Sequence, residues 1–307
     1  MALSGSTTRP DEATAAVLVV RGDCEGALGQ ADSLSKAVGT VVVIDNNDVA
    51  ALARAQGSTA IHVLHHGNRG GLAGGYNRAL EWLRHHVPAV SQVVFVDQDS
   101  DTTVLARFLR APDVQALLAR PTTAAVAPAY RERATGLRGR PIELHRWRAV
   151  HLPRDFTGLR QVAFVINSMS VWRMSALQRI GPFDEALAVD HVDTDLCLRA
   201  RALGLGIWNH GDHVFDHAIG ERRHYRLFGR DLQATGHGPA RRRMIGRNTV
   251  WLGLTWWWRE PAFAGLCALR LAYEAVGILM AEDEKPARLL ALLRGSLEGV
   301  LMRVRGR

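Results

Sequence analysis

The sequence predicts an α/β fold, in which helices flank a mostly parallel, doubly wound sheet and a helical region follows. Short β-forming apolar runs alternate with helical patterns through the first hundred residues, as is typical of parallel sheets. Runs such as "VVFV" are continuously apolar, which indicates strands covered on both faces. Aspartates follow where several of these runs end, and ligands of open α/β sheets bind beyond those carboxyl ends.

The first half of the chain contains the clearest elements. Its strands are rich in Val and Ile, and its helices carry apolar residues on one side, such as Leu28 and Leu34. The last helix of this half begins in a glycine cluster. The predicted strands are 15–20, 40–48, 58–66 and 93–97, and the predicted helices are 24–38 and 71–86.

The second half is less regular. A helix end and a strand are predicted within 117–130, a strand, turn and helix within 162–181, a helix at 190–204 and a strand at 207–217. Residues 131–148 carry six arginines and predict a mobile basic loop. From about residue 240 the chain is helical and apolar.

Composition restricts the classes of partner. The chain of 307 residues has 38 basic and 30 acidic residues, a net charge of +8. This balance favours an anionic partner, such as nucleotide phosphates, nucleic acid or an acidic membrane surface. Three widely spaced cysteines form neither a disulfide framework nor a zinc pattern, so we expect small core residues in a reducing, cytoplasmic setting.

Asp97 and Asp99 are the first candidate site. They follow the "VVFV" strand directly, and Asp is also common in plain turns. Carboxylates at this position suit a hard cation such as Mg²⁺ or Mn²⁺ whose shell is completed by substrate phosphates. Asp45 ends an earlier strand in the same way, so we expect these carboxylates at one edge of the sheet.

The glycine cluster "NRGGLAGG" (68–75) has two interpretations. Its spacing does not fit the dinucleotide fingerprint, and it follows the third strand rather than the first. The glycines either let backbone N–H groups and a helix N-terminus approach an anion or allow close helix–sheet packing.

The densest acidic cluster is Asp190, Asp193 and Asp195 in "AVDHVDTDLCLRAR". Acids in a first helical turn suit the helix dipole, and a carboxylate there can also act as a general base toward a hydroxyl nucleophile. His210, His213 and His217 follow in the chain, and each alone is more often structural than a ligand.

Four blocks in this order resemble family 2 glycosyltransferases of the GT-A fold, and within them the bacterial rhamnosyltransferase group. They are "VVVIDNND", "NRGGLAGGYNRAL", "VVFVDQDS" and "IGPFDEALAVDHVDTDLCLRARALG", and a later "GRNTVWL" resembles the segment that follows in the family. The blocks are weak singly and specific together.

The resemblance implies a Rossmann-like GT-A domain over 15–240, with a nucleotide-binding half (15–100) and an acceptor half (101–240), followed by a helical region over 241–307. It implies an inverting transfer of a sugar, with dTDP-rhamnose as the expected donor of L-rhamnose. The acceptor would be a hydroxyl of a glycan or lipid-linked glycan in bacterial surface polysaccharide synthesis.

The resemblance also implies roles for individual residues. Asp193 would be the catalytic base, and Asp99 and His217 would bind Mg²⁺ or Mn²⁺. Asp190 and Ser168 would line the acceptor side. The nucleotide-sugar would contact Asp45, Asn68, Gly71, Asn77, Asp97 and Arg247. Departures from the family pattern at residues 167–170, at 188–189 and at 21–23 leave the acceptor and the base contact open.

The C-terminal region adds a prediction about location. Tryptophans 251 and 256–258 stand beside a long apolar stretch that carries only Arg270 and Glu274. A second helix over 286–305 places Leu289, Leu293, Leu297, Leu301 and Val304 on one side and Arg288, Arg294, Arg303 and Arg305 on the other. This favours peripheral binding to an anionic membrane, at the inner face of the cytoplasmic membrane. Core helices covering the sheet, or a homodimer contact, fit the same pattern.

A different class of function also fits the composition: a basic protein that binds nucleic acid or a membrane surface without catalysis. The acids at strand ends count against it, because a polyanion binder would avoid them. The sheet region also lacks aromatics interleaved with basic residues. We therefore predict no nucleic-acid partner. The longest uncharged stretches are about a dozen residues, which predicts no membrane span.

Overall fold

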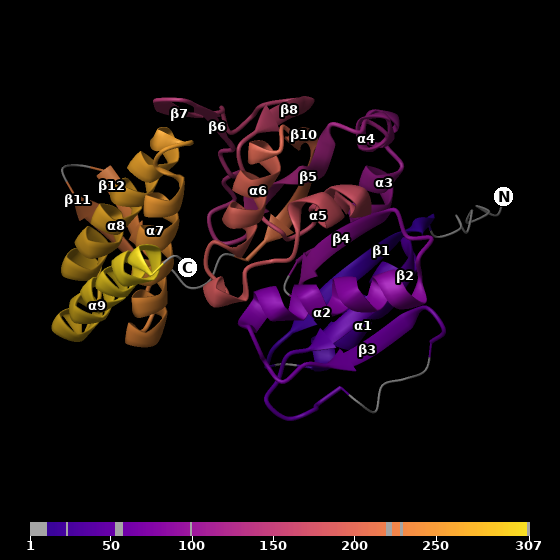
Figure 1. Ribbon diagram of the computed structural model, residues 1–307, viewed down its shortest axis with the longest axis horizontal. Coiled ribbons are helices and arrows are strands. Elements are labelled where there is room, and N and C mark those ends of the chain that lie inside the picture. The colour runs from indigo at the N-terminus through magenta and orange to yellow at the C-terminus, as the bar shows by residue number, and fades with distance from the viewer. Residues whose placement is uncertain are drawn as a thin grey trace. The chain divides into compact units, whose positions relative to one another are not determined.

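The computed structural model describes residues 11–22, 24–52, 58–98, 100–218, 223–227 and 230–305 (Figure 1). The chain forms two compact units. The first, here the sheet unit, comprises Met1–Arg131 and Asp155–His217, and the second, here the helical unit, comprises Glu132–Arg154 and Ala218–Arg307. The boundary predicted at residue 240 falls inside the helical unit, because the hairpin before it packs on a C-terminal helix.

The sheet unit is built on an eight-stranded sheet of order β3-β2-β1-β4-β9-β5-β10-β8. The strands β1 to β4 pair in parallel and β9 runs antiparallel to both β4 and β5. The strands are β1 (Asp11–Val20), β2 (Val38–Asp45), β3 (Ile61–His65), β4 (Gln92–Asp97), β5 (Thr123–Glu132), β8 (Leu159–Val162), β9 (Val171–Arg173) and β10 (Gly206–His217). The predicted elements of the first half are therefore confirmed.

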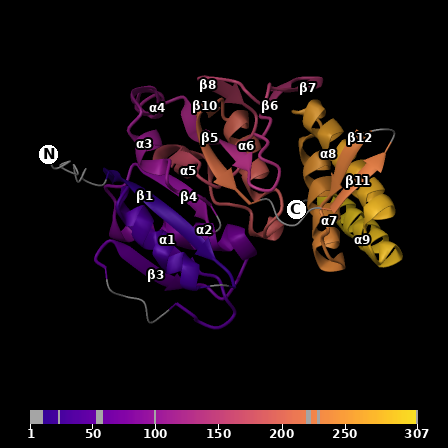
Figure 2. The same ribbon diagram turned by 180° about the vertical axis from the view of Figure 1, so that it is seen from behind.

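Helices cover both faces of this sheet (Figures 1 and 2). Alternate residues of β1 point to opposite faces of the sheet: Leu18 shares a core cluster with Leu34 of α1, whereas Val19 lies against Gly75 of α2. The helices are α1 (Glu25–Ser35), α2 (Gly71–His86), α3 (Leu105–Leu109), α4 (Pro112–Leu118), α5 (Met174–Ile180) and α6 (Val192–Ala202). Continuously apolar strands are what a sheet buried on both faces requires.

The register of the parallel strands places two predicted aspartates at one sheet edge. Asp45 pairs with Val20 and Asp97 pairs with Val19, on opposite sides of β1. Because adjacent strands lie about 4.8 Å apart, the two backbones are separated by roughly 10 Å at this edge. The expectation that both acids end at the same edge is confirmed.

In its described residues the helical unit contains three long helices and two hairpins: α7 (Pro239–Trp256), α8 (Pro261–Ala281), α9 (Lys285–Val304), β6–β7 (Ile142–His145 and Arg148–His151) and β11–β12 (Arg223–Leu227 and Arg230–Ala234). The prediction of a mobile loop over 131–148 is wrong for its second part. Its arginines hid a short strand in which apolar Ile142 and Leu144 alternate with polar residues, and Leu144 is buried on β6.

Glycines bring α7 and α9 into close contact. A Cβ atom on Gly295 or Gly299 of α9 would collide with backbone oxygens of α7, and one on Gly246 would collide with Leu292. The contact therefore uses small residues and backbone rather than interlocking leucines. As a consequence, the apolar side predicted for α9 is left outside: Leu293 and Leu297 are 62% and 65% exposed.

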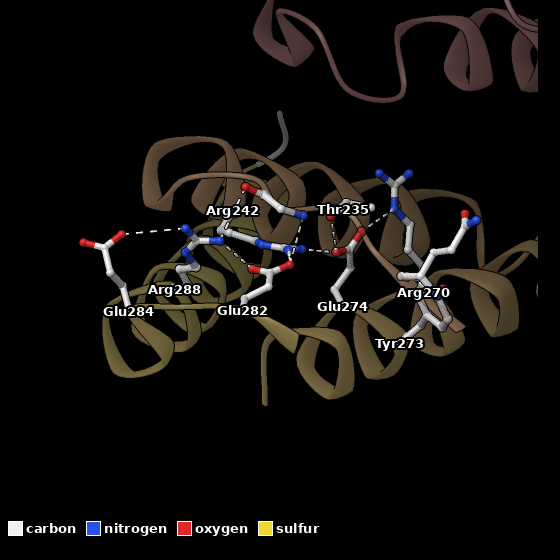
Figure 3. Close-up of polar contacts among 10 residues, drawn as sticks. Thr235, Arg242, Arg270, Tyr273, Glu274, Glu282, Glu284 and Arg288 are labelled. Atoms are coloured by element: carbon white, nitrogen blue, oxygen red, sulfur yellow. Dashed lines mark hydrogen bonds and ion pairs between the residues drawn. The ribbon is translucent and has the colours of Figure 1, made fainter. Parts of the chain in front are cut away.

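A buried network of charges joins the helices of this unit (Figure 3). The Arg242 guanidinium, which has no exposed surface, donates to the carboxylates of Glu274 and Glu282. Glu282 also accepts from Arg288 at 2.8 Å, and Thr235 donates to Glu274 at 3.1 Å. The prediction that Arg288 faces lipid headgroups is thus wrong, because the side chain is held inside the unit.

We expect Arg242→Met to lower the free energy of unfolding by about 3–5 kcal/mol, because it leaves two buried carboxylates without their shared cation. Urea unfolding followed by circular dichroism measures the loss. Arg243→Met is the matched control, since Arg243 is the next residue, is 59% exposed and pairs with Glu298 at the surface, where ion pairs contribute little. Equal losses in the two variants would contradict the structural role of the network.

Candidate active site

Two predicted acids, one on a strand and one on a helix, converge on the hydroxyl of Tyr76. Asp97 ends β4 and Asp193 lies in the first turn of α6. The pKa of Tyr76 is well above its usual value because the side chain is fully buried and because the carboxylates of Asp97 and Asp193 lie nearby. The two carboxylates therefore lie near one buried hydroxyl, although they stand 96 residues apart in the chain.

The Tyr76 ring is held by aromatic contacts. Its centroid lies 4.6 Å from that of Phe95 on β4 and 5.0 Å from that of Phe183. Phe183 belongs to the "GPFDE" turn, and its backbone N–H and C=O both bond to the side chain of Asn77, at 2.8 and 3.0 Å. The α2 helix therefore fixes the strand end and the turn that leads to Asp193.

Asp193 and Asp195 have different environments. Asp193 is half-buried, and its Oδ1 accepts from the Thr194 N–H at 2.7 Å. Asp195 is buried and accepts from Arg199 Nε at 2.8 Å, while the same guanidinium bonds the Ile180 carbonyl at 3.1 Å. Asp195 thus orients the Arg199 guanidinium, which ties α6 to α5.

Strained backbone surrounds this region. Among the described residues, five non-glycine residues have positive φ, and four of them belong to the segments already named: Asn68, Met169, Ala188 and His191. Each such residue costs of order 1–3 kcal/mol. Strain of this kind persists where the surroundings fix a functional geometry, so its position supports a site here.

The candidate acceptor residues lie in two of these strained segments. Ser168 precedes Met169, is buried and shares a very short hydrogen bond with Ser100, just after β4. Asp190 precedes His191 and is 8% exposed. Ser168 therefore lies beside the end of β4, and Asp190 lies just before the start of α6. Neither side chain lies on the open surface.

Asp45 is buried and already engaged. Its Oδ2 accepts from the N–H groups of Ala51 and Leu52 at 2.7 and 3.0 Å, and its Oδ1 from Asn47. Burial alone would raise the pKa of Asp45, but these hydrogen bonds outweigh it and hold the pKa below the usual value. The carboxylate organises the loop after β2, and a nucleobase would have to replace one of these donors.

The structure around the glycine cluster supports the interpretation that these glycines allow close packing. A Cβ on Gly71 would lie 2.7 Å from the Ala188 oxygen, and one on Gly74 would collide with the Arg69 carbonyl. Gly70 and Gly71 both have positive φ. These glycines bring the start of α2 against the strained 185–188 segment, and this contact positions the approach to Asp193.

Two amides near this contact have structural partners. Asn68 Oδ1 accepts from Asn46 Nδ2 at 3.2 Å, and the same Nδ2 bonds the Gly71 carbonyl at 3.1 Å. Asn77 bonds Phe183 and, at 2.9 Å, Glu185. Asn77 therefore clamps α2 to the "GPFDE" turn, and its predicted nucleotide contact would compete with these bonds.

The predicted metal ligands are only partly described. Asp99 lies outside the described residues, whereas Asp97 and His217 are described. The Asp101 N–H donates to the Asp216 carbonyl at 3.2 Å, so the segment after β4 runs beside the end of β10 that carries His217. Within the described part of the chain no group of three or more His, Cys, Asp or Glu side chains is arranged to hold a metal. The carboxylate of Asp97 is a ligand type that Mg²⁺ and Mn²⁺ accept, and the predicted metal roles of Asp99 and His217 stay predictions.

His210 and His213, the other two histidines of this cluster, have structural contacts, as expected. His210 Nε2 lies 2.9 Å from Asp113 Oδ2, and the His213 ring packs at 5.3 Å on Phe108. His210 is seven residues before His217 on β10, roughly 23 Å along an extended strand. Cys197 and Cys267 are buried, as predicted, whereas Cys24 is half-exposed.

Arg247 lies on α7 in the helical unit, where its Nε donates to Asn248 Oδ1 at 2.9 Å. Its predicted contact with the nucleotide-sugar stays a prediction.

Sequence reasoning missed two residues. Tyr76 stands inside "AGGYNRA", where a tyrosine on an apolar helix side gives no signal beyond core packing. Asn46 is buried, and its Oδ1 has no hydrogen-bond partner among the described residues. Its position directly after Asp45, in a run of polar residues that ends a strand, was the available signal.

Comparison with known proteins identifies the fold. No protein-family model matches the sequence, and no curated protein matches it significantly. The structure is similar to the crystal structure of GalNAc-T7 with UDP, GalNAc and Mn²⁺, with a TM-score of 0.50, 12% identity and 77% of this chain covered. The match spans 48% of that chain, about half its length. S. aureus TarS is matched at a TM-score of 0.46 and 15% identity, over 93% of this chain and 43% of that one, a level too low to add to the argument. The α/β fold predicted from the sequence is confirmed: this chain has the same GT-A-type fold as GalNAc-T7, with a C-terminal helical part.

Proposed function

We propose that the protein transfers a sugar from a nucleotide-sugar donor to a hydroxyl of a glycan acceptor. The observation that carries the proposal is that Asp97, at the carboxyl end of a parallel strand, and Asp193, in the first turn of α6, both lie near the buried hydroxyl of Tyr76. A strand-end acid suits the diphosphate side, and a helix-start acid suits the hydroxyl that attacks. The shared fold of GalNAc-T7, crystallised with UDP, GalNAc and Mn²⁺, supports the same class of chemistry.

In this proposal Asp193 accepts the proton of the attacking acceptor hydroxyl. A carboxylate is a sufficient base when bond breaking to the diphosphate leads and positive charge develops on the sugar. Its Oδ1 is oriented by Thr194, and its other oxygen would take the proton. Attack from the face opposite the leaving diphosphate inverts the anomeric centre. Ser168 and Asp190 would contact the acceptor.

A divalent cation would be held by Asp97, Asp99 and His217 together with the diphosphate oxygens. Such an ion supplies charge neutralisation for the departing diphosphate. The residues of this chain align the donor: Asn46 Oδ1 offers a buried acceptor for a nucleobase N–H, beside the Asp45 predicted for that contact. This arrangement assigns base recognition to the loop after β2 as a whole.

The finer assignment rests on the sequence resemblance. It names L-rhamnose from dTDP-rhamnose as the donor and a lipid-linked glycan of bacterial surface polysaccharide synthesis as the acceptor. It also implies a cytoplasmic enzyme at the inner face of the membrane.

We expect slow hydrolysis of one nucleotide-sugar when the purified full-length protein is incubated with a donor panel that includes dTDP-rhamnose, with Mg²⁺ or Mn²⁺. Hydrolysis is expected because water can replace an absent acceptor. Released nucleoside diphosphate is measured, and thermal stabilisation by nucleoside diphosphate with Mn²⁺ is measured in parallel. Stabilisation by an oligonucleotide, with no response to any nucleotide-sugar, would favour a nucleic-acid-binding protein instead.

A further inference from the structure

Three exposed tryptophans gather at one end of the helical unit. Trp147 is 76% exposed at the tip of the β6–β7 hairpin, and Trp257 and Trp258 are 51% and 76% exposed in the turn between α7 and α8. The Ala262 N–H at the start of α8 donates to the Arg146 carbonyl at 3.3 Å, so the hairpin tip lies beside that turn. In Figures 1 and 2 the hairpin is drawn at this end of the helices.

Exposed arginines surround these tryptophans. Arg146 and Arg148 flank Trp147, and the Arg146 guanidinium lies 5.4 Å from the Trp147 ring centre. Arg259 follows Trp258 in the turn. Arg303 Nε donates to the Leu254 carbonyl at 3.4 Å, which brings the cationic last turn of α9 to the same end.

An apolar surface continues from this end along the helices. The outer sides of α8 and α9 expose Leu269, Leu293, Leu297 and Leu301, at 51–66%. The α8 helix is long and apolar enough to cross a membrane. Its most apolar 18-residue stretch has a mean hydropathy of 1.6, yet only 28% of that stretch is buried. The two charges on the helix, Arg270 and Glu274, lie 4.0 Å apart, and the expectation that the chain has no membrane span stays a prediction.

The inner side of α8 argues against a membrane span. Glu274 is tied to the buried Arg242, and that network continues to Glu282 and Arg288. Removing α8 from this bundle would leave those charges unpaired. The helix therefore keeps one side on the unit and offers only its outer side.

The charge distribution selects the partner of this surface. In a two-fold dimer that buries this end, like charges from two sets of arginines would face each other. Anionic lipid headgroups neutralise the same charges, and tryptophan is the side chain most enriched at the boundary between headgroups and acyl chains.

We propose that the protein docks on anionic bilayers through this aromatic and cationic end, with the outer sides of α8 and α9 lying in the plane of the interface. The hairpin tip with Trp147, Arg146 and Arg148 is an essential part of the contact. Docking does not depend on which sugar is transferred or on whether transfer occurs.

The test uses the full-length protein with two kinds of vesicle, phosphatidylcholine alone and phosphatidylcholine mixed with phosphatidylglycerol. We expect binding to the mixed vesicles only, release by high salt, and a blue shift of tryptophan emission that bromolipids quench. Arg146→Ser with Arg148→Ser should weaken binding about thirtyfold, since each surface arginine contributes roughly fivefold. Trp147→Ser with Trp258→Ser should weaken it at least as much.

The control is Arg120→Ser with Arg179→Ser, which removes two exposed arginines from the sheet unit. We expect it to bind as the parent protein does. The altered side chains are all exposed, so unchanged circular dichroism and melting temperature establish that each variant is folded. The proposal would be overturned by equal binding to neutral vesicles, by an equal loss in the control, or by binding that resists high salt. A dimer whose tryptophan emission is already shifted without vesicles would assign this end to a second copy and also overturn it.

Discussion

Asp193→Asn is expected to lower turnover by roughly a hundredfold or more while leaving donor binding nearly unchanged. The amide keeps the shape of the side chain and can still accept from the Thr194 N–H, but it cannot take a proton from the acceptor. The loss of a general base typically costs this much, about 2.7 kcal/mol in barrier height. Turnover is measured with the donor that the panel identifies, and donor affinity by titration calorimetry.

Asp195→Asn is the matched control on the same helix. It removes the charge that Arg199 bonds at 2.8 Å, so its main effect should be a lower unfolding temperature. The folded fraction should turn over at close to the parent rate. The reverse outcome, with Asp195→Asn inactive and Asp193→Asn active, would show that the catalytic carboxylate is two residues further along α6.

Removal of divalent cations is expected to abolish turnover, and addition of Mg²⁺ or Mn²⁺ is expected to restore it. A cation held by one or two protein carboxylates binds weakly unless a diphosphate completes its ligands. Binding of the nucleoside diphosphate should therefore also depend on the metal. Calorimetric titration of the diphosphate with and without the metal measures this directly, without relying on activity. Full activity in excess chelator would contradict the expectation.

Three variants locate the cation. Asp97→Asn, Asp99→Asn and His217→Ala should each raise the metal concentration needed for half-maximal activity or eliminate activity. His213→Ala serves as the control, because His213 is on the same strand four residues earlier and packs on Phe108. An equal effect of His213→Ala would indicate that β10 as a whole, rather than His217, supports the site.

Local patterns in the sequence were sufficient for the parallel half of the sheet. The strands β1 to β4 and the helix α2 were predicted because continuous apolar runs and 3.6-residue periodicity report burial directly. The antiparallel additions were harder. The central strand β9 spans only Val171–Arg173, too short to show alternation, and the arginines of 131–148 concealed the β6–β7 hairpin.

The same limit applies to the site. The sequence by itself determined the acids that follow strands and begin helices, and the order of blocks that resembles a glycosyltransferase family. Only the tertiary structure decided that Asp45 is saturated by its own loop, that Asn77 clamps a turn and that Tyr76 is buried near Asp97 and Asp193. It also decided that Arg288 is internal while Leu293 is outside. The physical reason is that residue type reports the chemistry a side chain offers, whereas its partner is set by long-range packing. Glycines at the α7–α9 contact illustrate this, because backbone approach there turned the leucine side of α9 outward.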